Sequence, residues 1–163
     1  ELDEGSDHRG PAAVIASDER GAATGVVSEG AAPRPPGPAR VLLAGLAAAR
    51  NGSQEALAAL ALRPDLELLI RPGEGMEPGD LLTRPRVRAA SAEERGQLRG
   101  VALVLAPAWC ESYPEEVPRA LRAGVPVIAT RQAAGAGAVS AEIPPGAVTA
   151  LVAALARLLP REP

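Results

Sequence analysis

The residues best suited to chemistry lie in one loop of the chain, directly after the apolar run VALVL at 101–105. This loop, APAWCESYP, contains the only Trp, Tyr and Cys and the carboxylate Glu111. It ends at Pro114, and proline is favoured at the first position of a helix. Free amides at a helix N-terminus bind phosphate, and a carboxylate beside them accepts hydrogen bonds from sugar hydroxyls. In the alternative interpretation, Glu111 is a solvated loop acid and Trp109 a packing residue, and position alone leaves both open.

The composition of the 163-residue chain excludes several other kinds of site. The single cysteine, Cys110, excludes a disulfide framework and a thiolate cluster, and without an activating base we expect it to be idle or buried. The only histidine, His8, lies in a polar N-terminal stretch, so a catalytic triad or a multi-histidine zinc site has no residue to use. We therefore expect no metal.

The charge and hydropathy of the chain argue against nucleic acid as a partner and against a membrane-spanning segment. A net charge of −3 with 1% aromatic residues argues against nucleic-acid binding, which usually needs a basic face and stacking rings. No apolar run approaches the ~18 residues of a membrane span, and no basic-then-apolar signal opens the chain. The sequence therefore predicts a soluble, cytoplasmic protein.

Apolar runs alternate with helical patterns after residue 40. Strands are expected at 41–46, 66–70, 87–89, 101–105 and 125–129. Helices are expected at 53–62 with Ser53 as cap, at 92–99 with a Ser91–Glu94 capping box, before Ala123–Gly124, and at 147–159. Continuously apolar strands between helices indicate an α/β fold, a Rossmann-like three-layer parallel sheet. Ligands of such sheets bind beyond the carboxyl ends of the strands.

The chain divides into three segments by composition. Residues 1–29 carry short apolar runs in a polar, acidic stretch, and residues 30–40, GAAPRPPGPAR, hold four prolines and two glycines. That density of proline and glycine prevents regular structure, so we predict a linker there. The Rossmann-like domain is then expected at 41–163.

The segment 101–130, VALVLAPAWCESYPEEVPRALRAGVPVIAT, resembles the signature of the group 1, or family 4, glycosyltransferases, which use nucleotide sugars and have the two-domain GT-B fold. Matching positions are Pro107, Glu111, Ser112, Tyr113, Pro114, Ala120, Leu121, Gly124, Pro126 and Thr130. AVIASD at 13–18 and VVSEG at 26–30 resemble the end of the family's N-terminal domain and its link. IPPG at 143–146 with the apolar run after it resembles its closing helix. The likeness covers only the final, donor-binding half of a family member, and the half with the acceptor site is missing.

The resemblance implies roles for individual residues. Glu111 matches the first glutamate of the family's EX7E motif, which contacts the donor sugar. Ser112, Tyr113 and Pro114 match the loop that faces the donor phosphates. Gly45 fits the glycine of the family's "GR…K" pattern, and Arg50 is the nearest candidate for its lysine, which supplies positive charge to the diphosphate.

The chain also departs from the family pattern. The second glutamate of the motif, which holds the nucleotide ribose in the family, falls on Arg119, and a guanidinium accepts no hydrogen bond. The family arginine beside Gly45 is Leu46 here. Pro118 would cost ~3 kcal/mol inside a helix that began at Pro114, so we expect the helix to begin nearer Pro118 and to displace Arg119.

Other motifs are weaker indications of a binding site. Gly135 and Gly137 imitate part of a dinucleotide fingerprint, but they lie past the last central strand rather than in the first βα turn. Arg84, Arg86 and Arg88 offer charge to an anion, although arginines spaced by two are more typical of a solvated edge.

The leading hypothesis is the donor-binding half of a glycosyltransferase that transfers a sugar from UDP- or GDP-sugar to a glycan, lipid or protein. It needs no separate cofactor and depends on the missing N-terminal domain for activity. The alternative is a degenerate, non-catalytic relative that serves as a binding or scaffold module, which Arg119 and Leu46 favour. An ordinary dinucleotide-binding domain would need a glycine fingerprint after VLLAGL, and none is there.

Overall fold

A single parallel sheet organises the computed structural model, which describes residues 37–73, 79–110, 114–135 and 137–161. Within these residues the strand order is β3-β2-β1-β4-β5-β6, and every neighbouring pair is parallel. The strands are β1 (Ala39–Leu46), β2 (Leu66–Arg71), β3 (Val87–Ala89), β4 (Leu103–Ala106), β5 (Val127–Ala129) and β6 (Ala141–Glu142). The chain first builds outward from β1 to β3 and then returns beside β1 with β4. The order therefore reverses between β1 and β4.

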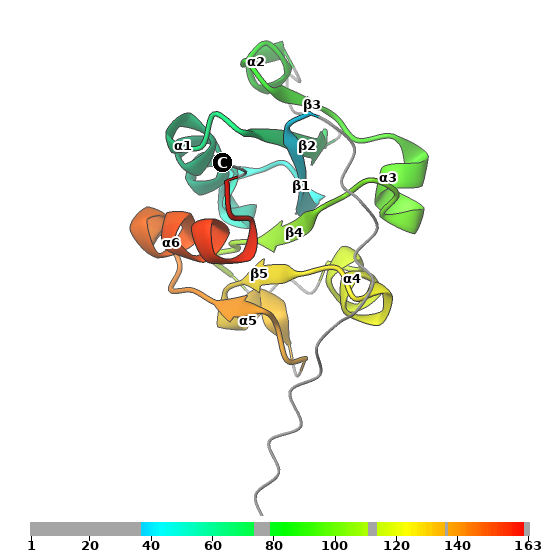
Figure 1. Cartoon of the computed structure of the whole chain (residues 1–163), viewed down its shortest axis with the longest axis vertical. Helices are drawn as coiled ribbons and strands as arrows, with labels where there is room; N and C mark the ends of the chain where they lie inside the picture. Colours follow the sequence, from blue (N-terminus) through cyan, green and yellow to red (C-terminus); the bar gives the residue numbers. More distant parts are fainter. Residues whose placement is uncertain (1–36, 74–78, 111–113, 136, 162–163) are drawn as a thin grey trace, which may run out of the picture. The chain divides into compact units, whose positions relative to one another are not determined.

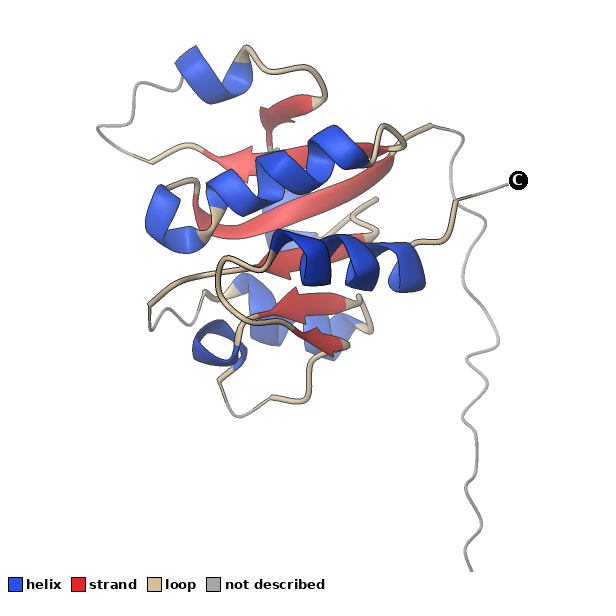
Figure 2. Ribbon diagram, turned by 90° about the vertical axis from the view of Figure 1, so that its left-hand side faces the viewer, coloured by secondary structure: helices blue, strands red, loops and turns tan. Residues whose placement is uncertain are grey.

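Helices cover both faces of this sheet (Figure 1). The helices are η1 (a 3-10 turn, Ala49–Asn51), α1 (Ser53–Leu62), α2 (Gly79–Leu82), α3 (Ala92–Gln97), α4 (Glu116–Ala123), α5 (Arg131–Ala134) and α6 (Val148–Leu158). In Figure 1, α1 and α6 lie on one side of the strands and α3 and α4 on the other. Figure 2 shows α1 and α6 lying across the strands on their shared face. The architecture is the three-layer, Rossmann-like α/β fold that the sequence predicts.

Alternation along the buried strands forms two separate cores. On β1, Val41 and Leu43 pack toward α1 and α6, while Leu42 and Ala44 pack toward the face that α4 covers. All four side chains are almost completely buried. This double burial explains why the strands are continuous apolar runs instead of alternating ones.

Arginine side chains connect the elements near α1. Arg86 donates hydrogen bonds to the carbonyl oxygens of Leu60, Arg63 and Leu66 at 3.0, 2.8 and 3.1 Å. Leu60 lies in the last turn of α1, whose final carbonyls have no partner within the helix. Arg86 therefore caps α1 and joins it to β2. The prediction of a solvated edge is wrong for this arginine, and only Arg84 of the three is exposed.

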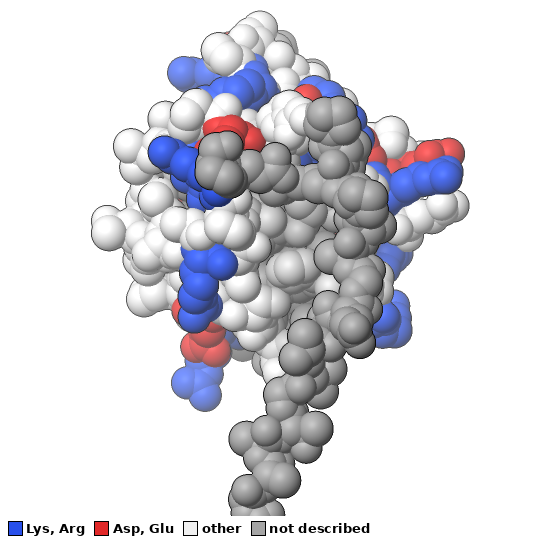
Figure 3. Space-filling model, viewed as in Figure 1, with Lys and Arg blue, Asp and Glu red and all other residues white. Residues whose placement is uncertain are grey.

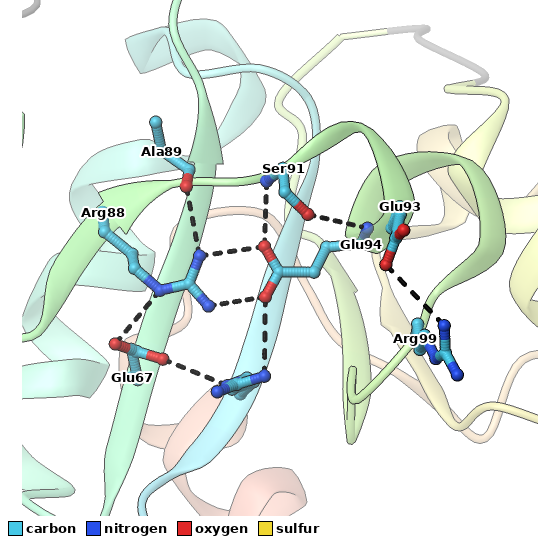
Figure 4. Close-up of polar contacts among 8 residues, drawn as sticks. Glu67, Arg88, Ala89, Ser91, Glu93, Glu94 and Arg99 are labelled. Atoms are coloured by element: carbon cyan, nitrogen blue, oxygen red, sulfur yellow. Dashed lines mark hydrogen bonds and ion pairs between the residues drawn. The ribbon is translucent and has the colours of Figure 1, made fainter.

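A polar network joins β2, β3 and α3 (Figure 4). Ser91 and Glu94 form the predicted capping box, in which each accepts a hydrogen bond from the other's backbone amide at 3.2 and 2.8 Å. The buried Glu94 carboxylate also accepts two hydrogen bonds from Arg88, which pairs in turn with Glu67 of β2. The Arg88 hydrogen bonds lower the pKa of Glu94 to about 2, and the Ser91 amide contributes further.

Several predicted element boundaries need correction. β4 begins at Leu103 instead of residue 101, and β5 begins at Val127 instead of residue 125. Ser53 is the first residue of α1 and its side chain caps nothing, because Gly52 occupies the N-cap position. β1 begins at Ala39, so Ala39 and Arg40 belong to the sheet rather than to the linker. α4 begins at Glu116, two residues before Pro118. Pro118 thus lies in the first turn, where its missing amide leaves no helical hydrogen bond unmade.

Some predictions have no counterpart in this description. The segment 1–29 and most of the linker lie outside the described residues, so the predicted end of an N-terminal domain stays a prediction. The short elements α2, α5 and β6 were not predicted, because two to four residues are too few to display a hydrophobic period.

Candidate functional site

A cavity of about 470 Å³ opens beyond the carboxyl ends of β1, β2 and β4. It lies where the strand order reverses, the position at which open α/β sheets bind ligands. Its lining consists of Gly45, Leu46, Arg50, Asn51, Arg71, Cys110, Pro114, Glu115 and Glu116.

The segment after β1 forms one wall of this cavity. The Asn51 side chain donates a hydrogen bond to the Leu46 carbonyl at 2.7 Å and closes the turn between β1 and α1. Gly52 follows with a φ of +78°, and a Cβ there would lie 2.4 Å from the carbonyl oxygen of Pro107. Glycine at this position therefore allows the backbone after β1 to approach the backbone after β4.

Hydrogen bonds also fix the segment after β4. The Trp109 amide donates to the carbonyl of Arg50 at 2.9 Å, and the Trp109 indole nitrogen donates to Oε1 of Glu55 at 2.7 Å. The indole ring lies against Gly146, where an added Cβ would come within 2.6 Å of it. Trp109 thus connects the segments after β1 and β4 to the segment before α6.

Two arginines and two glutamates contribute charge to the cavity. Glu116 of α4 is 2% exposed, and its Oε2 accepts a hydrogen bond from the Gly45 amide at 3.2 Å. Its Oε1 lies 3.8 Å from Nη1 of Arg71, the last residue of β2. Glu115 lies 3.9 Å from the same guanidinium but is exposed. Within the part of the lining that the structure describes, the formal charges of Arg50, Arg71, Glu115 and Glu116 sum to zero.

The structure brings some of the predicted site residues together. Gly45 and Arg50 from the end of β1 and the turn after it, and Pro114 from a distant part of the sequence, all line the cavity. Glu111, Ser112 and Tyr113 lie outside the described residues, and their roles stay predictions. Cys110 is an exposed thiol that lines the cavity, so the expectation that it is idle or buried is wrong with respect to burial.

Arg119 is directed to α3 instead of the cavity. Its Nη1 donates to the carbonyl of Arg95 at 2.7 Å, and its Nη2 lies 3.3 Å from Glu115. Within the described residues it is not part of the cavity lining. The position that matches the family's second glutamate therefore serves helix packing in this chain.

Four residues of the cavity lining were not predicted from the sequence: Asn51, Arg71, Glu115 and Glu116. Arg71 is the polar residue that ends an apolar strand, which is a usable signal, because such residues lie at the carboxyl edge of the sheet. For Glu116 the signal was an acidic pair directly after Pro114, at the expected start of a helix. No feature of the sequence around Asn51 distinguishes it from an ordinary turn residue.

Three further properties of the described residues bear on function: their capacity to bind metal, the hydropathy of their helices and their surface charge. Within that part of the chain, no three side chains of His, Cys, Asp or Glu are placed to hold a metal ion. None of the helices there has the length and hydropathy needed to cross a membrane. On the face in Figure 3, basic and acidic side chains of the described residues are interspersed instead of gathered into one basic patch.

Known structures share this fold. The chain is similar to the C-terminal domain of a glycosyl transferase group 1 family protein (LpcC) from Francisella tularensis, with 16% identity, a TM-score of 0.61 and coverage of 77% of each chain. It is similar to sucrose-phosphate synthase from Thermosynechococcus elongatus, with 22% identity, a TM-score of 0.60 and coverage of 75% of this chain and 36% of that one. The galactosyltransferase WaaB, described as acting on the lipopolysaccharide outer core, gives 22% identity, a TM-score of 0.62 and coverage of 78% and 42%.

No protein-family model and no curated protein sequence matches the chain. The structural likeness shows the fold: a domain of the kind that these glycosyltransferases contain. The chain spans 36% and 42% of the length of the synthase and of WaaB, and 77% of the isolated C-terminal domain.

Proposed function

We propose that this chain is the donor-binding half of a GT-B glycosyltransferase and binds a UDP- or GDP-sugar. One observation carries the proposal. Gly45 and Arg50 from the end of β1 and the turn after it, and Pro114 after β4, which the resemblance assigns to the donor phosphates, line one cavity at the reversal of strand order. The shared fold of three glycosyltransferase structures supports the same proposal.

Each residue has a defined task in this proposal. Arg50 supplies positive charge to the diphosphate, and Arg71 on the neighbouring strand end adds to it. Glu111 positions the donor sugar by accepting hydrogen bonds from its hydroxyls. The acceptor, a glycan, lipid or protein, is bound by a further domain, and the reaction needs both. The chain's own contribution is therefore affinity for a nucleoside diphosphate and its sugar.

Ligand-observed NMR of the chain with UDP, GDP and NAD tests this proposal, since the method detects millimolar binding, worth about 4 kcal/mol. We expect saturable binding of one nucleoside diphosphate and none of NAD. Arg50→Gln should weaken this binding by about tenfold, because it removes a charge-assisted contact. Arg84→Gln is the matched control, because it removes the same charge from an exposed position outside the cavity lining.

The sugar contact is tested separately. UDP- or GDP-sugars should bind more tightly than the matching nucleoside diphosphate, and Glu111→Ala should abolish that difference while it leaves the affinity for the diphosphate unchanged. Equal affinities of Arg50→Gln and Arg84→Gln would contradict the proposed phosphate contact. The absence of any nucleoside diphosphate binding at millimolar concentration would contradict the donor-binding function itself.

A second candidate function is a non-catalytic binding or scaffold module with the same fold. Two observations favour it. Arg119 bonds to α3 instead of lining the cavity, and the carboxylate of Glu116 accepts the Gly45 amide hydrogen that the donor phosphate would need. This candidate predicts no nucleotide binding by the natural chain.

A further inference from the structure

The amide of Gly45 and the beginning of α4 together form a place suited to an anion. A backbone amide directed into a cavity and the positive end of a helix dipole both favour negative charge. α4 is eight residues long, and Glu116 is its first residue. Arg71 faces the same place from the end of β2.

A carboxylate of the chain itself occupies this place. Glu116 is 2% exposed, accepts the Gly45 amide hydrogen at 3.2 Å and lies 3.8 Å from Arg71. A glutamate is rarely so buried unless it is paired, and Glu116 satisfies that requirement with these two partners. Both partners are groups that a bound phosphate would otherwise use.

The position of this carboxylate has an electrostatic consequence for ligands. A phosphate at the Gly45 amide would have to displace Glu116 or lie close to a buried negative charge, where repulsion is screened less than in water. Among the described residues of the lining, two glutamates cancel the charge of two arginines. The neighbouring Glu115 is exposed and does not contact the amide, so its charge is screened by solvent.

From these contacts we infer that Glu116 is a specificity-determining residue that occupies the anion position of the cavity and competes with phosphate groups for the Gly45 amide. The inference deepens the proposed function, since it concerns the same cavity and rests on donor phosphates binding there. A nucleoside diphosphate then binds fully only when the Glu116 carboxylate has left the amide. Removing this one carboxylate leaves a net positive charge among the described lining residues and frees the Gly45 amide for an anion.

The test compares four variants in pairs by calorimetric titration with UDP, GDP and inorganic pyrophosphate. Glu116→Ala removes the carboxylate and vacates the position, and Glu116→Gln removes only the charge and keeps an oxygen for the Gly45 amide. Glu115→Ala and Glu115→Gln are the matched controls, with the same change of charge and composition one residue away. Thermal unfolding of each variant verifies that it is folded, and Glu116→Gln provides the comparison if Glu116→Ala is not.

We expect Glu116→Ala to bind pyrophosphate and the nucleoside diphosphate about tenfold more tightly than the natural chain, and Glu116→Gln to show a smaller gain. The Glu115 variants should gain less than about threefold, because their charge is solvent-exposed. Pyrophosphate should also shift the amide resonance of Gly45 in Glu116→Ala and leave it in place in the natural chain. Equal gains for the Glu115 and Glu116 variants, or no gain, would overturn the inference.

The outcomes separate the inference from the proposed function. Binding of UDP or GDP by the natural chain without a gain in Glu116→Ala would overturn the inference and leave donor binding intact. Binding by Glu116→Ala but not by the natural chain would support the inference and favour the non-catalytic candidate. An absence of binding in both would overturn the two together.

Discussion

At the scale of single residues, Gly52 determines whether the two sides of the cavity meet. Its φ is +78°, and an added Cβ would lie 2.4 Å from the Pro107 carbonyl oxygen and 2.5 Å from the Pro107 ring. Both the left-handed backbone and the contact with another backbone segment disfavour a side chain. We predict that Gly52→Ala lowers the free energy of unfolding by at least about 2 kcal/mol.

Urea unfolding of Gly52→Ala beside Gly96→Ala measures this effect. Gly96 lies inside α3 with no atom within 4 Å of an added Cβ. Alanine there should raise the free energy of unfolding by roughly 0.5–1 kcal/mol, because alanine favours helix. Two variants that shift stability by the same amount and sign would contradict the close approach of Gly52 to Pro107.

At the scale of the elements, Arg86 joins α1 to β2 through three backbone carbonyls. Lysine carries the same charge but lacks the planar fork that reaches several acceptors at once. We predict that Arg86→Lys lowers the free energy of unfolding by about 1–3 kcal/mol, because carbonyls at the end of α1 lose their partner. Chemical denaturation would measure the loss.

Arg84→Lys provides the reference for this prediction. Arg84 is exposed two residues away, and its replacement should change stability by less than about 0.5 kcal/mol. A loss of similar size at both positions would mean that the guanidinium bonds of Arg86 contribute nothing specific.

The strands of the sheet could be predicted from the sequence, but the long-range hydrogen bonds of the polar side chains around it could not. The runs 41–46 and 101–105 are apolar throughout, and 66–70 is interrupted only by Glu67. Burial on both faces makes such runs recognisable as parallel strands. The Ser91–Glu94 capping box was equally predictable, because its two residues lie only three positions apart in the sequence. The hydrogen bonds of Arg86 and Glu116 join residues 20 to 71 positions apart in the sequence, and no local sequence pattern predicts a partner so distant.

Some residues of the candidate site could likewise be predicted from the sequence, and others could not. Gly45 and Arg50 were predicted because a family resemblance assigned positions to them, and the cavity brings them together with Pro114. The start of α4 was predicted only as nearer Pro118 than Pro114, since whether Pro118 interrupts a helix depends on a boundary that only the fold defines. Without the exact start, Glu116 was not recognised as a buried carboxylate at the beginning of the helix.

At the scale of the whole molecule, two carboxylates with lowered pKa values, Asp65 and Glu94, make the free energy of unfolding depend on pH in the acid range. Hydrogen bonds from Arg63 lower the pKa of Asp65 from 3.8 to about 2, and those from Arg88 lower the pKa of Glu94 from 4.5 to about 2. The folded pKa is below the unfolded one, so the unfolded chain binds more protons as the pH falls. The stabilisation is complete above about pH 5 and is lost progressively down to about pH 2.

Glu94→Gln tests one of these contributions. Its free energy of unfolding should be lower at neutral pH, because the Arg88 charge loses one of its two carboxylate partners, and should fall less steeply between about pH 5 and pH 2. Urea unfolding at a series of pH values gives both quantities. An unchanged slope would show that Glu94 does not contribute to the acid dependence.

The placement of Trp109 has a spectroscopic consequence for the same molecule. Because the chain has a single tryptophan, all of its indole emission originates beside Cys110 and the cavity. The indole nitrogen bonds to Glu55, and the backbone of the same residue bonds to Arg50. Intrinsic fluorescence is therefore an unlabelled reporter of that edge of the sheet, and its quenching or wavelength shift would register an occupant without any dye or tag.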